Sequence, residues 1–290
     1  MEFYEPFYYD TLEFRRELIV NKPPDYLYHY TTAAGLLGII QSNQYSSFQM
    51  WASDSRFLND SSEYTGGLKV AEEILNSSKY KSSDLIQRAS TLLSGSNGRV
   101  MVLSASSKRN LLSQWRAYSE NGGYSIELKT DLFKATEYLT NHYLAECIYS
   151  KEELSEKMNS CIEWHQKKFE IFTENQPQNV VDHHLGNCLK GLVGTIRALA
   201  TLFKHDSFLE ESEWRYVVTI PLESELKLRN SNGLLVPYIS LKFPVNSISQ
   251  VSVAPGSRQE LAKLSAEDLL INNIKDLKLD VKLSGTSFIW

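Results

Sequence analysis

The chain has 290 residues, of which 42% are hydrophobic and 22% are charged, a balance that supports a large buried core and excludes a disordered protein. Its formal net charge of −5 gives no overall basic surface of the kind that nucleic-acid-binding proteins usually carry, although brief contact with nucleic acid is compatible with it. The three cysteines (Cys147, Cys161 and Cys188) form no CxxC pair, which favours a reduced, cytoplasmic protein.

No targeting or membrane segment is expected. The sequence Met1-Glu2-Phe3-Tyr4-Glu5-Pro6 has neither the basic nor the apolar part of a signal peptide. The longest apolar stretch, Gly191 to Phe203, contains Arg197 and is too short to cross a bilayer. We therefore expect a cytoplasmic protein that does not contact a membrane.

Residues 1–24 are predicted to form an aromatic, helical arm. A helix over Tyr8 to Val20 would end before Pro23 and Pro24, because proline cannot continue a helix. The arm is either a lid or partner-binding segment or an ordinary packing helix.

The next part of the chain mixes strands and helices. Thr31 or Thr32 is a suitable N-cap for a helix with an apolar face, and Asn59 or Asp60 is a suitable N-cap for the helix that carries Glu63 in its first turn. Aromatic, β-branched and alternating patterns predict the strands. The predicted strands here are Tyr26–Tyr30, Phe48–Ser53, Val100–Leu103, Tyr124–Leu128 and Tyr143–Tyr149, and a helix is predicted over Asn110–Ser119.

Residues 151–205 are predicted to be a helical insertion of two helices separated by Glu174 to Gln178. Its cysteines and histidines do not have the spacing of zinc ligands, so we expect no metal site. His183 and His184, for example, would point about 100° apart on a helix.

The last third of the chain returns to strands, around one helix. The strands are predicted at Trp214–Ile220, Leu235–Leu241, Ser249–Ala254, Leu277–Leu283 and Ser287–Ile289, with the helix over Gln259–Ile271. Strands at both ends and helices between them indicate an α+β fold, not βαβ alternation. We expect a single α+β domain over residues 25–290.

The sequence contains no P-loop, no GxGxxG after a strand, no HExxH and no GxSxG motif. Three groups of residues remain as candidates for chemistry. The first is His29 with Tyr30 and Thr31, the second is Ser104 and Ser106 followed by Trp115, Arg116 and Tyr118, and the third is Glu211 with Glu213.

The two glutamates are spaced i and i+2, so in extended geometry their carboxylates would share a face. A carboxylate placed beside a developing oxocarbenium ion stabilises the breaking of a glycosidic C–N bond, and a histidine with a hydroxyl neighbour suits ribose hydroxyls. A plainer interpretation is also open. The first two groups would then be aromatic packing and a helix cap, and the glutamates would be solvated, with Glu213 paired to Arg215 or Arg116.

These motifs, in this order, resemble domain-of-unknown-function family 2971, whose pattern is Y-H-Y-T, N-D-x-x-E, M-W-x-x-Y-A-x-x-G and E-x-E-W-R. The resemblance covers roughly residues 26–255, and the chain departs from the pattern at Gln114 and Ser119. The matching segments are Tyr28-His29-Tyr30-Thr31-Thr32, Phe57-Leu58-Asn59-Asp60-Ser61-Ser62-Glu63, Gln114-Trp115-Arg116-Ala117-Tyr118 with Gly122 and Gly123, and Glu211-Ser212-Glu213-Trp214-Arg215.

At one remove, the order of these motifs resembles the ADP-ribosyltransferase-like fold, including its branch of bacterial toxins and defence proteins. The resemblance implies a split β-sheet core, here with an extra helical layer, and NAD as a substrate without a metal. It implies that Glu213 is catalytic, that Glu211 orients the acceptor, and that Trp115 or Tyr118 packs on nicotinamide. The remaining NAD contacts would come from His29, Tyr30, Thr31, Asn59 and Ser104.

We therefore expect an NAD-dependent ADP-ribosyltransferase, in the glycosyltransferase class, that acts as a toxin, toxin–antitoxin or antiviral defence effector. Its acceptor would be RNA, DNA or protein, and an antitoxin or chaperone could be its partner. The alternatives are an NAD glycohydrolase and a non-catalytic nucleotide-sensing or protein-interaction module. A basic groove for a nucleic-acid acceptor could form from Arg99, Lys108, Arg109 and Arg116.

Overall fold

The computed structural model of the chain describes residues 5–41, 47–58, 61–80, 83–95, 98–118, 122–134, 142–231, 233–274 and 279–285. Its helices are α1 (Glu5–Ile19), α2 (Ala33–Gln41), α3 (Ser61–Leu75), α4 (Asp84–Ser94), α5 (Leu112–Tyr118), α6 (Asp131–Lys134), α7 (Lys151–Thr173), α8 (Gln178–Leu202) and α9 (Gln259–Asn273). Short 3₁₀ helices are η1 (Ser55–Phe57), η2 (Ser78–Tyr80), η3 (Asp206–Glu211) and η4 (Val245–Ser247).

The strands form one mixed, mostly antiparallel sheet, in which β10 and β9 are the parallel pair among the described strands. The sheet order is β10-β9-β4-β1-β3-β2-β8-β7, and β6 pairs with β3 on one side and β5 on the other. The strands are β1 (Tyr26–Thr32), β2 (Ser47–Asp54), β3 (Arg99–Ser106), β4 (Gly123–Lys129), β5 (His142–Glu146), β6 (Glu213–Ile220), β7 (Lys227–Ser231), β8 (Leu234–Pro244), β9 (Ile248–Val253) and β10 (Asp280–Leu283).

The sheet divides along one edge of β3. Strand β6 pairs with the whole length of β3, from Arg99 to Ser106, so β1 and β2 share the other edge. Strand β1 pairs there only at Ser106, and β2 pairs only at Met101 and Val102. Ser104 lies between these two points, so the sheet opens beside it into two branches.

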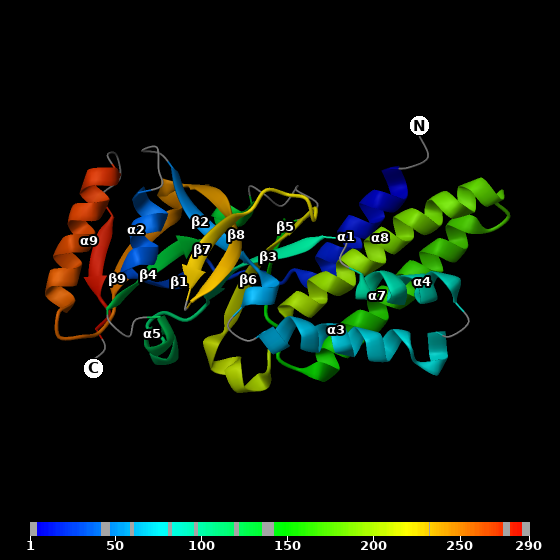
Figure 1. Cartoon of the computed structure of the whole chain (residues 1–290), viewed down its shortest axis with the longest axis horizontal. Helices are drawn as coiled ribbons and strands as arrows, with labels where there is room; N and C mark the ends of the chain where they lie inside the picture. The colour runs from blue at the N-terminus through cyan, green and yellow to red at the C-terminus, as the bar shows by residue number, and fades with distance from the viewer. Residues whose placement is uncertain are drawn as a thin grey trace.

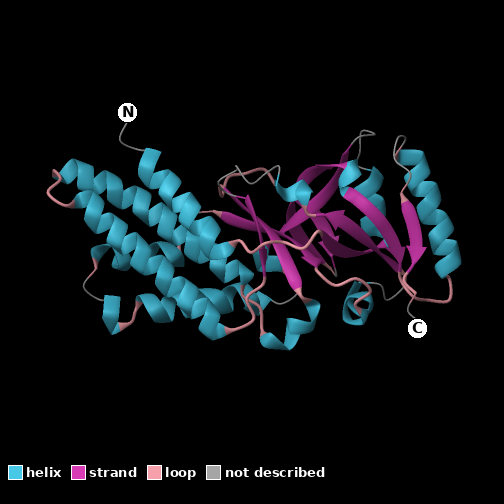
Figure 2. Ribbon diagram, turned by 180° about the vertical axis from the view of Figure 1, so that it is seen from behind, coloured by secondary structure: helices cyan, strands magenta, loops and turns pink. Residues whose placement is uncertain are grey.

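Each face of the divided sheet packs against its own helices, since successive side chains of a strand point to opposite faces. Val100, Val102 and Val217 belong to the core formed with α1, α3, α4, α7 and α8. Met101, Leu103 and Tyr216 belong to the core formed with α2 and α9. The views from the front and from behind show the helical layer at one end of an elongated molecule and the sheet at the other (Figure 1 and Figure 2).

The helical layer includes the amino-terminal helix. Arg15 Nε of α1 donates a hydrogen bond of 2.9 Å to Thr195 Oγ1 of α8, and Lys168 of α7 forms an ion pair of 2.5 Å with Asp10. Helix α1 is therefore a packing helix on α7 and α8. The two helices expected within residues 151–205 are confirmed as α7 and α8.

The α+β class is confirmed, with three corrections to the expected elements. Strand β3 extends through Ser106, so Ser104 and Ser106 lie within it and not after it. Strand β5 ends at Glu146, and Ile148 makes only an isolated bridge to Phe203. Strand β7 was not expected, because its sequence is polar and has no β-branched residue. The expected strand Ser287–Ile289 lies outside the described residues.

Candidate functional site

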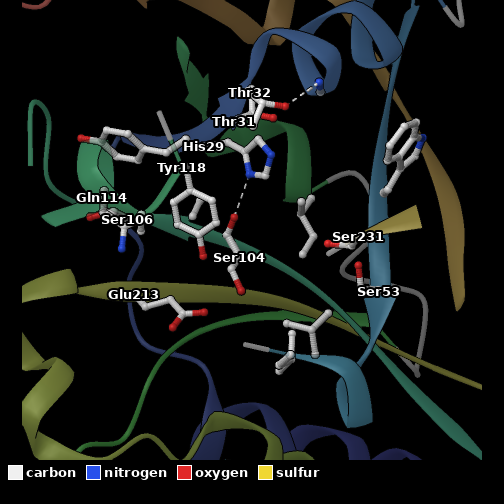
Figure 3. Close-up of a pocket in the computed structure, with 18 of the residues that line it drawn as sticks. His29, Thr31, Thr32, Ser53, Ser104, Ser106, Gln114, Tyr118, Glu213 and Ser231 are labelled. Atoms are coloured by element: carbon white, nitrogen blue, oxygen red, sulfur yellow. Dashed lines mark hydrogen bonds between the residues drawn. The ribbon is translucent and has the colours of Figure 1, made fainter. Parts of the chain in front are cut away.

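A cavity of about 780 Å³ opens where the sheet divides, next to the helical layer. Its walls come from β1, β2, β3, β6 and β7, from α2, α5 and η3, and from the first turn of α3, segments far apart in the sequence. Figure 3 shows Glu213 on one side of this cavity, Ser53 and Ser231 on the other, and His29 and Ser104 between them. A cavity of this size suits a ligand as large as a dinucleotide.

Most of the expected site residues line this cavity, although they come from distant parts of the chain. Trp115 does not line it, and Asn59 lies outside the described residues. The expected residues found in the wall are His29, Tyr30, Thr31, Ser104, Tyr118, Glu211 and Glu213.

His29 is held in one tautomer by the opening in the sheet. Its Nδ1 lies 2.9 Å from the carbonyl oxygen of Ser104, which can only accept a hydrogen bond, so Nδ1 carries the proton. Burial lowers the pKa of His29, so the ring is neutral at pH 7 and Nε2 keeps its lone pair. No hydrogen bond to Nε2 occurs within the described part of the chain, so Nε2 is available as an acceptor in the cavity.

The two aromatic candidates of the second group have different positions. Trp115 is fully buried and packs edge-on against Tyr30, with ring centroids 4.8 Å apart. Tyr118 lines the cavity, and burial together with the charges of Glu213 and Glu211 raises its pKa to about 12. Of the two residues, only Tyr118 is placed to contact a ligand, and its hydroxyl stays protonated at neutral pH.

Tyr30 and Thr31 are engaged in holding the structure around the cavity. The Tyr30 hydroxyl donates to the Lys108 carbonyl and accepts from the Leu111 amide, each at 2.9 Å, so it fixes the loop before α5. Thr31 Oγ1 lies only 2.0 Å from where a Cβ of Gly35 would be, so it packs directly on the first turn of α2. The cap of α2 is Thr32, whose Oγ1 accepts a 3.1 Å hydrogen bond from the Gly35 amide.

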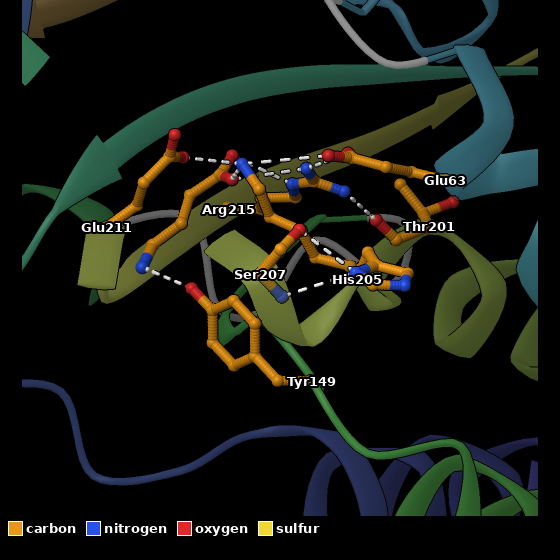
Figure 4. Close-up of polar contacts among 9 residues, drawn as sticks. Glu63, Tyr149, Thr201, His205, Ser207, Glu211 and Arg215 are labelled. Carbon is orange, nitrogen blue, oxygen red and sulfur yellow. Dashed lines mark hydrogen bonds and ion pairs between the residues drawn. The ribbon is translucent and has the colours of Figure 1, made fainter. Parts of the chain in front are cut away.

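Glu213 belongs to a buried ion network with Lys204 and Arg215. Figure 4 shows the Glu63, Arg215 and Glu211 members of this network. Glu213 Oε1 accepts a 2.9 Å hydrogen bond from Arg215 Nε, and its Oε2 accepts one of 2.6 Å from Lys204 Nζ. Lys204 also lies 2.5 Å from a Glu211 carboxylate oxygen, and Arg215 pairs with Glu63 of α3. Three carboxylates and two cations therefore meet in the cavity wall.

The network keeps Glu213 ionised. Burial raises the pKa of its carboxyl, but the charges of Arg215 and Lys204 outweigh burial and bring the pKa down to about 2. Burial raises the pKa of Glu63, and Arg215 offsets only part of that rise. The charges of Glu213 and Glu63 raise the pKa of Lys204 despite its own burial.

The two glutamates meet by a different route from the one expected. Ser212 adopts a left-handed conformation, with φ of 43° and ψ of 52°, and Glu211 ends η3. The pair is therefore not in extended geometry, and the expectation that i and i+2 spacing alone aligns the carboxylates is wrong. Lys204 joins them instead, while Ser106 Oγ donates a 2.6 Å hydrogen bond to the Glu211 carbonyl.

Four charged residues of this wall were not recognised as site residues from the sequence: Glu63, Lys204, Arg215 and Arg229. Arg215 was considered only as an ion-pair partner of Glu213, and Glu63 only as a charge in the first turn of a helix. The Asn232-Gly233 pair is a strong hairpin signal that could have located β7 and hence Arg229. Lys204 follows an apolar helix and has no local signal.

The candidate basic groove does not form part of the cavity wall. Lys108, Arg109 and Arg116 are exposed around α5, and Arg99 pairs with Asp54 at 3.3 Å. Within the described ranges, no group of histidine, cysteine and acidic side chains could hold a metal ion. Nor does any helix in those ranges have the length and apolar character needed to cross a bilayer.

Comparison with known proteins gives one match. Residues 114–216 match the family described as Protein of unknown function (DUF2971), a segment that includes Tyr118 and runs through the Glu211 to Arg215 motif. No curated protein and no solved structure matches the chain. The expected family is therefore confirmed over the segment 114–216, about a third of the chain.

Proposed function

We propose that the protein is an NAD-dependent ADP-ribosyltransferase whose cavity holds NAD. The observation that carries the proposal is the convergence of His29, Tyr118 and an ionised Glu213 on one cavity, although they lie on β1, α5 and β6. This convergence fits a split β-sheet core of the ADP-ribosyltransferase type. The helical layer adds to that core.

In this reaction the bond between C1′ of the ribose and N1 of nicotinamide breaks, and its electron pair stays on the nicotinamide nitrogen. The ribose then carries positive charge over C1′ and the ring oxygen, and a nucleophilic group of a macromolecule attacks C1′ and loses its proton. An ionised carboxylate held beside C1′ lowers the energy of the charged transition state. Among the described residues of the cavity wall, Glu213 is the one whose lowered carboxyl pKa keeps this negative charge at neutral pH.

The other residues of the wall would hold the substrate. The lone pair on Nε2 of His29 can accept a hydrogen bond from a ribose hydroxyl, because Nδ1 is committed to the Ser104 carbonyl. Tyr118 offers a ring on which nicotinamide can pack. The ammonium group of Lys204 joins the carboxylates of Glu211 and Glu213. Glu211 is therefore close enough to Glu213 to orient the attacking group.

The test is release of nicotinamide from NAD by the purified protein, alone and with added RNA, DNA or cell lysate. Glu213→Gln should lower the rate by on the order of 10²- to 10³-fold, as expected for loss of one preorganised electrostatic group. Glu210→Gln, which removes a charge from the exposed face of η3, serves as the matched control and should leave the rate unchanged. An equal rate in Glu213→Gln and wild type would refute the catalytic assignment.

The acceptor decides between transfer and hydrolysis. Release that requires an added macromolecule, together with labelling of that macromolecule from labelled NAD, supports a transferase. Rapid NAD loss without labelling identifies an NAD glycohydrolase, in which water is the acceptor.

A second candidate is a non-catalytic nucleotide-sensing module. It is favoured by the engagement of both Glu213 oxygens by Arg215 and Lys204, which compensates much of the carboxylate charge. In that case NAD or ADP-ribose would raise the melting temperature without turnover. A ligand at 100 times its dissociation constant adds about 2.7 kcal/mol to the free energy of unfolding, so thermal shift detects it readily.

A further inference from the structure

Arg229 of β7 is a cation in the cavity wall whose surroundings differ from those of the other basic residues there. Its Nη2 donates a 3.1 Å hydrogen bond to Ser53 Oγ on β2, a neutral acceptor. Its Nε is buried and has no hydrogen-bond partner. No carboxylate within the described ranges forms an ion pair with Arg229.

The contrast with Arg215 is direct. Arg215 donates to Glu213 and to the Thr201 carbonyl, and it pairs with Glu63, so its burial is compensated by charge. Arg229 is half-buried with only a hydroxyl as its partner. A guanidinium removed from water without an anion is unfavourable unless a ligand supplies the anion.

Because of the position of Arg229, the two ends of the cavity differ in charge. Arg229 is close enough to His29 to lower the pKa of that ring by its charge. The carboxylate of Glu213 lies across the cavity from Ser53, to which Arg229 is hydrogen-bonded (Figure 3). Lys204 joins Glu211 to Glu213. One end of the cavity therefore has a cation without a carboxylate partner, the other end has carboxylates paired with Lys204 and Arg215, and His29 lies between them.

We propose that Arg229 is the anchor of an anion subsite that binds the phosphate or diphosphate group of a nucleotide. The planar guanidinium matches phosphate oxygens and can donate two parallel hydrogen bonds. The hydrogen bond from Nη2 to Ser53 Oγ fixes the orientation of the Arg229 guanidinium in the cavity wall. The identification of this group as the diphosphate of NAD rests on the proposed function, whereas the subsite itself does not.

With NAD in this orientation, the diphosphate lies at Arg229, and the nicotinamide ring, which carries the positive charge, lies with its ribose toward Glu213. The opposite orientation would place the diphosphate beside Glu211 and Glu213, where the cations Lys204 and Arg215 are already paired with carboxylates. Arg229 would thus be a positioning residue that sets which end of the ligand meets Glu213.

The experiment measures binding of ADP and of inorganic pyrophosphate by calorimetry at fixed ionic strength, since neither probe has the bond that is cleaved in NAD. Arg229→Gln should weaken both by about 10- to 100-fold, the size expected for loss of a charge-assisted hydrogen-bonded pair. Arg229→Lys, which keeps the charge but not the fork, should weaken binding by less. Lys227→Gln removes an exposed charge from the same strand and should leave binding unchanged.

Equal ADP affinity in wild type and Arg229→Gln would overturn the proposal, as would absence of ADP and pyrophosphate binding to the wild type at millimolar concentration. Melting temperatures of all variants establish that they are folded. If Arg229→Gln is not folded, the comparison of Arg229→Lys with wild type provides the test. ADP binding that depends on Arg229, without nicotinamide release from NAD, would keep the subsite and reject the transferase.

Discussion

Lys204 is the residue on which the buried network of the cavity wall depends. Its ammonium group lies 2.6 Å from Glu213, 2.5 Å from Glu211 and 3.6 Å from Glu63. Without it, Arg215 is the remaining cation for the three carboxylates within the network. A single side chain that follows helix α8 therefore helps Arg215 to keep Glu213 charged while it is buried.

Replacing Lys204 should be strongly destabilising. Lys204→Met leaves buried carboxylates without a partner and should lower the free energy of unfolding by about 3–5 kcal/mol, measured by urea denaturation. Lys151→Met, which breaks the exposed pair with Glu73, should cost no more than about 1 kcal/mol. Similar losses in the two variants would contradict this description of the network.

The double variant Lys204→Met with Glu213→Gln tests whether the two charges depend on each other. It should lose less stability than the sum of the single variants, because each replacement removes the charge that the other leaves unpaired. Additive losses would show that Lys204 acts through Glu211 or Glu63 alone.

Helices and strands with a local sequence pattern were predicted correctly, whereas those that depend on pairing with a distant segment were not. The apolar run of β3, the alternation in β4 and the caps of α2 were visible in the sequence. The residues of strand β7 show no such pattern, since Lys227-Leu228-Arg229-Asn230-Ser231 is polar and forms a strand by pairing with β8, and the local signal lies in the turn that follows. This turn includes Gly233 at φ of 80°, a conformation that favours glycine.

The candidate site was predictable to the same extent. The Glu211 to Arg215 motif and His29 were recognised because each lies in a short motif. Glu63 was not assigned to the site, because it is 152 positions from Arg215 and no local pattern joins the two. Lys204 was missed for a similar reason, since only the fold of the chain brings it to the glutamates.

The contact between α3 and α8 places Glu63 of α3 near Arg215, which donates a hydrogen bond to the Thr201 carbonyl of α8. This helix contact depends on a glycine. A Cβ on Gly67 would lie 2.6 Å from the carbonyl oxygen of Ala200, whereas a Cβ on Gly66 would lie 3.5 Å from the Phe203 ring. Gly67→Ala should therefore push the helices apart and destabilise the protein by about 1–3 kcal/mol.

Gly66→Ala is the matched control in the same helix and should be neutral or stabilising by up to about 1 kcal/mol, since alanine favours helix. Urea denaturation of both variants gives the comparison. Gly67→Ala with wild-type stability would show that α3 and α8 are not in backbone contact.

For the whole molecule, stability should fall on mild acidification. Burial lowers the pKa of His165 in the helical layer to about 4, below its usual 6.5, so the unfolded chain binds a proton that the folded protein excludes. This contribution is fully present above pH 6.5 and is lost as the pH falls toward 4, a loss of about 3 kcal/mol. His29 acts in the same direction.

Urea denaturation between pH 7 and pH 4.5 measures this loss, and His165→Gln should remove most of it. Glu213 does not contribute in this window, because its low folded pKa matters only as the pH falls below the ordinary glutamate value of 4.5. An unchanged pH dependence in His165→Gln would assign the loss to other groups.

The buried ion network also limits how this protein can exchange parts with its relatives. The segment 114–216 carries Lys204, Glu211, Glu213 and Arg215, whereas Glu63 comes from outside it. A chimera that received this segment from a relative would keep its buried charges compensated only if its own α3 supplied a matching acid. The charged residues of the network must therefore be exchanged together, although they are scattered along the chain.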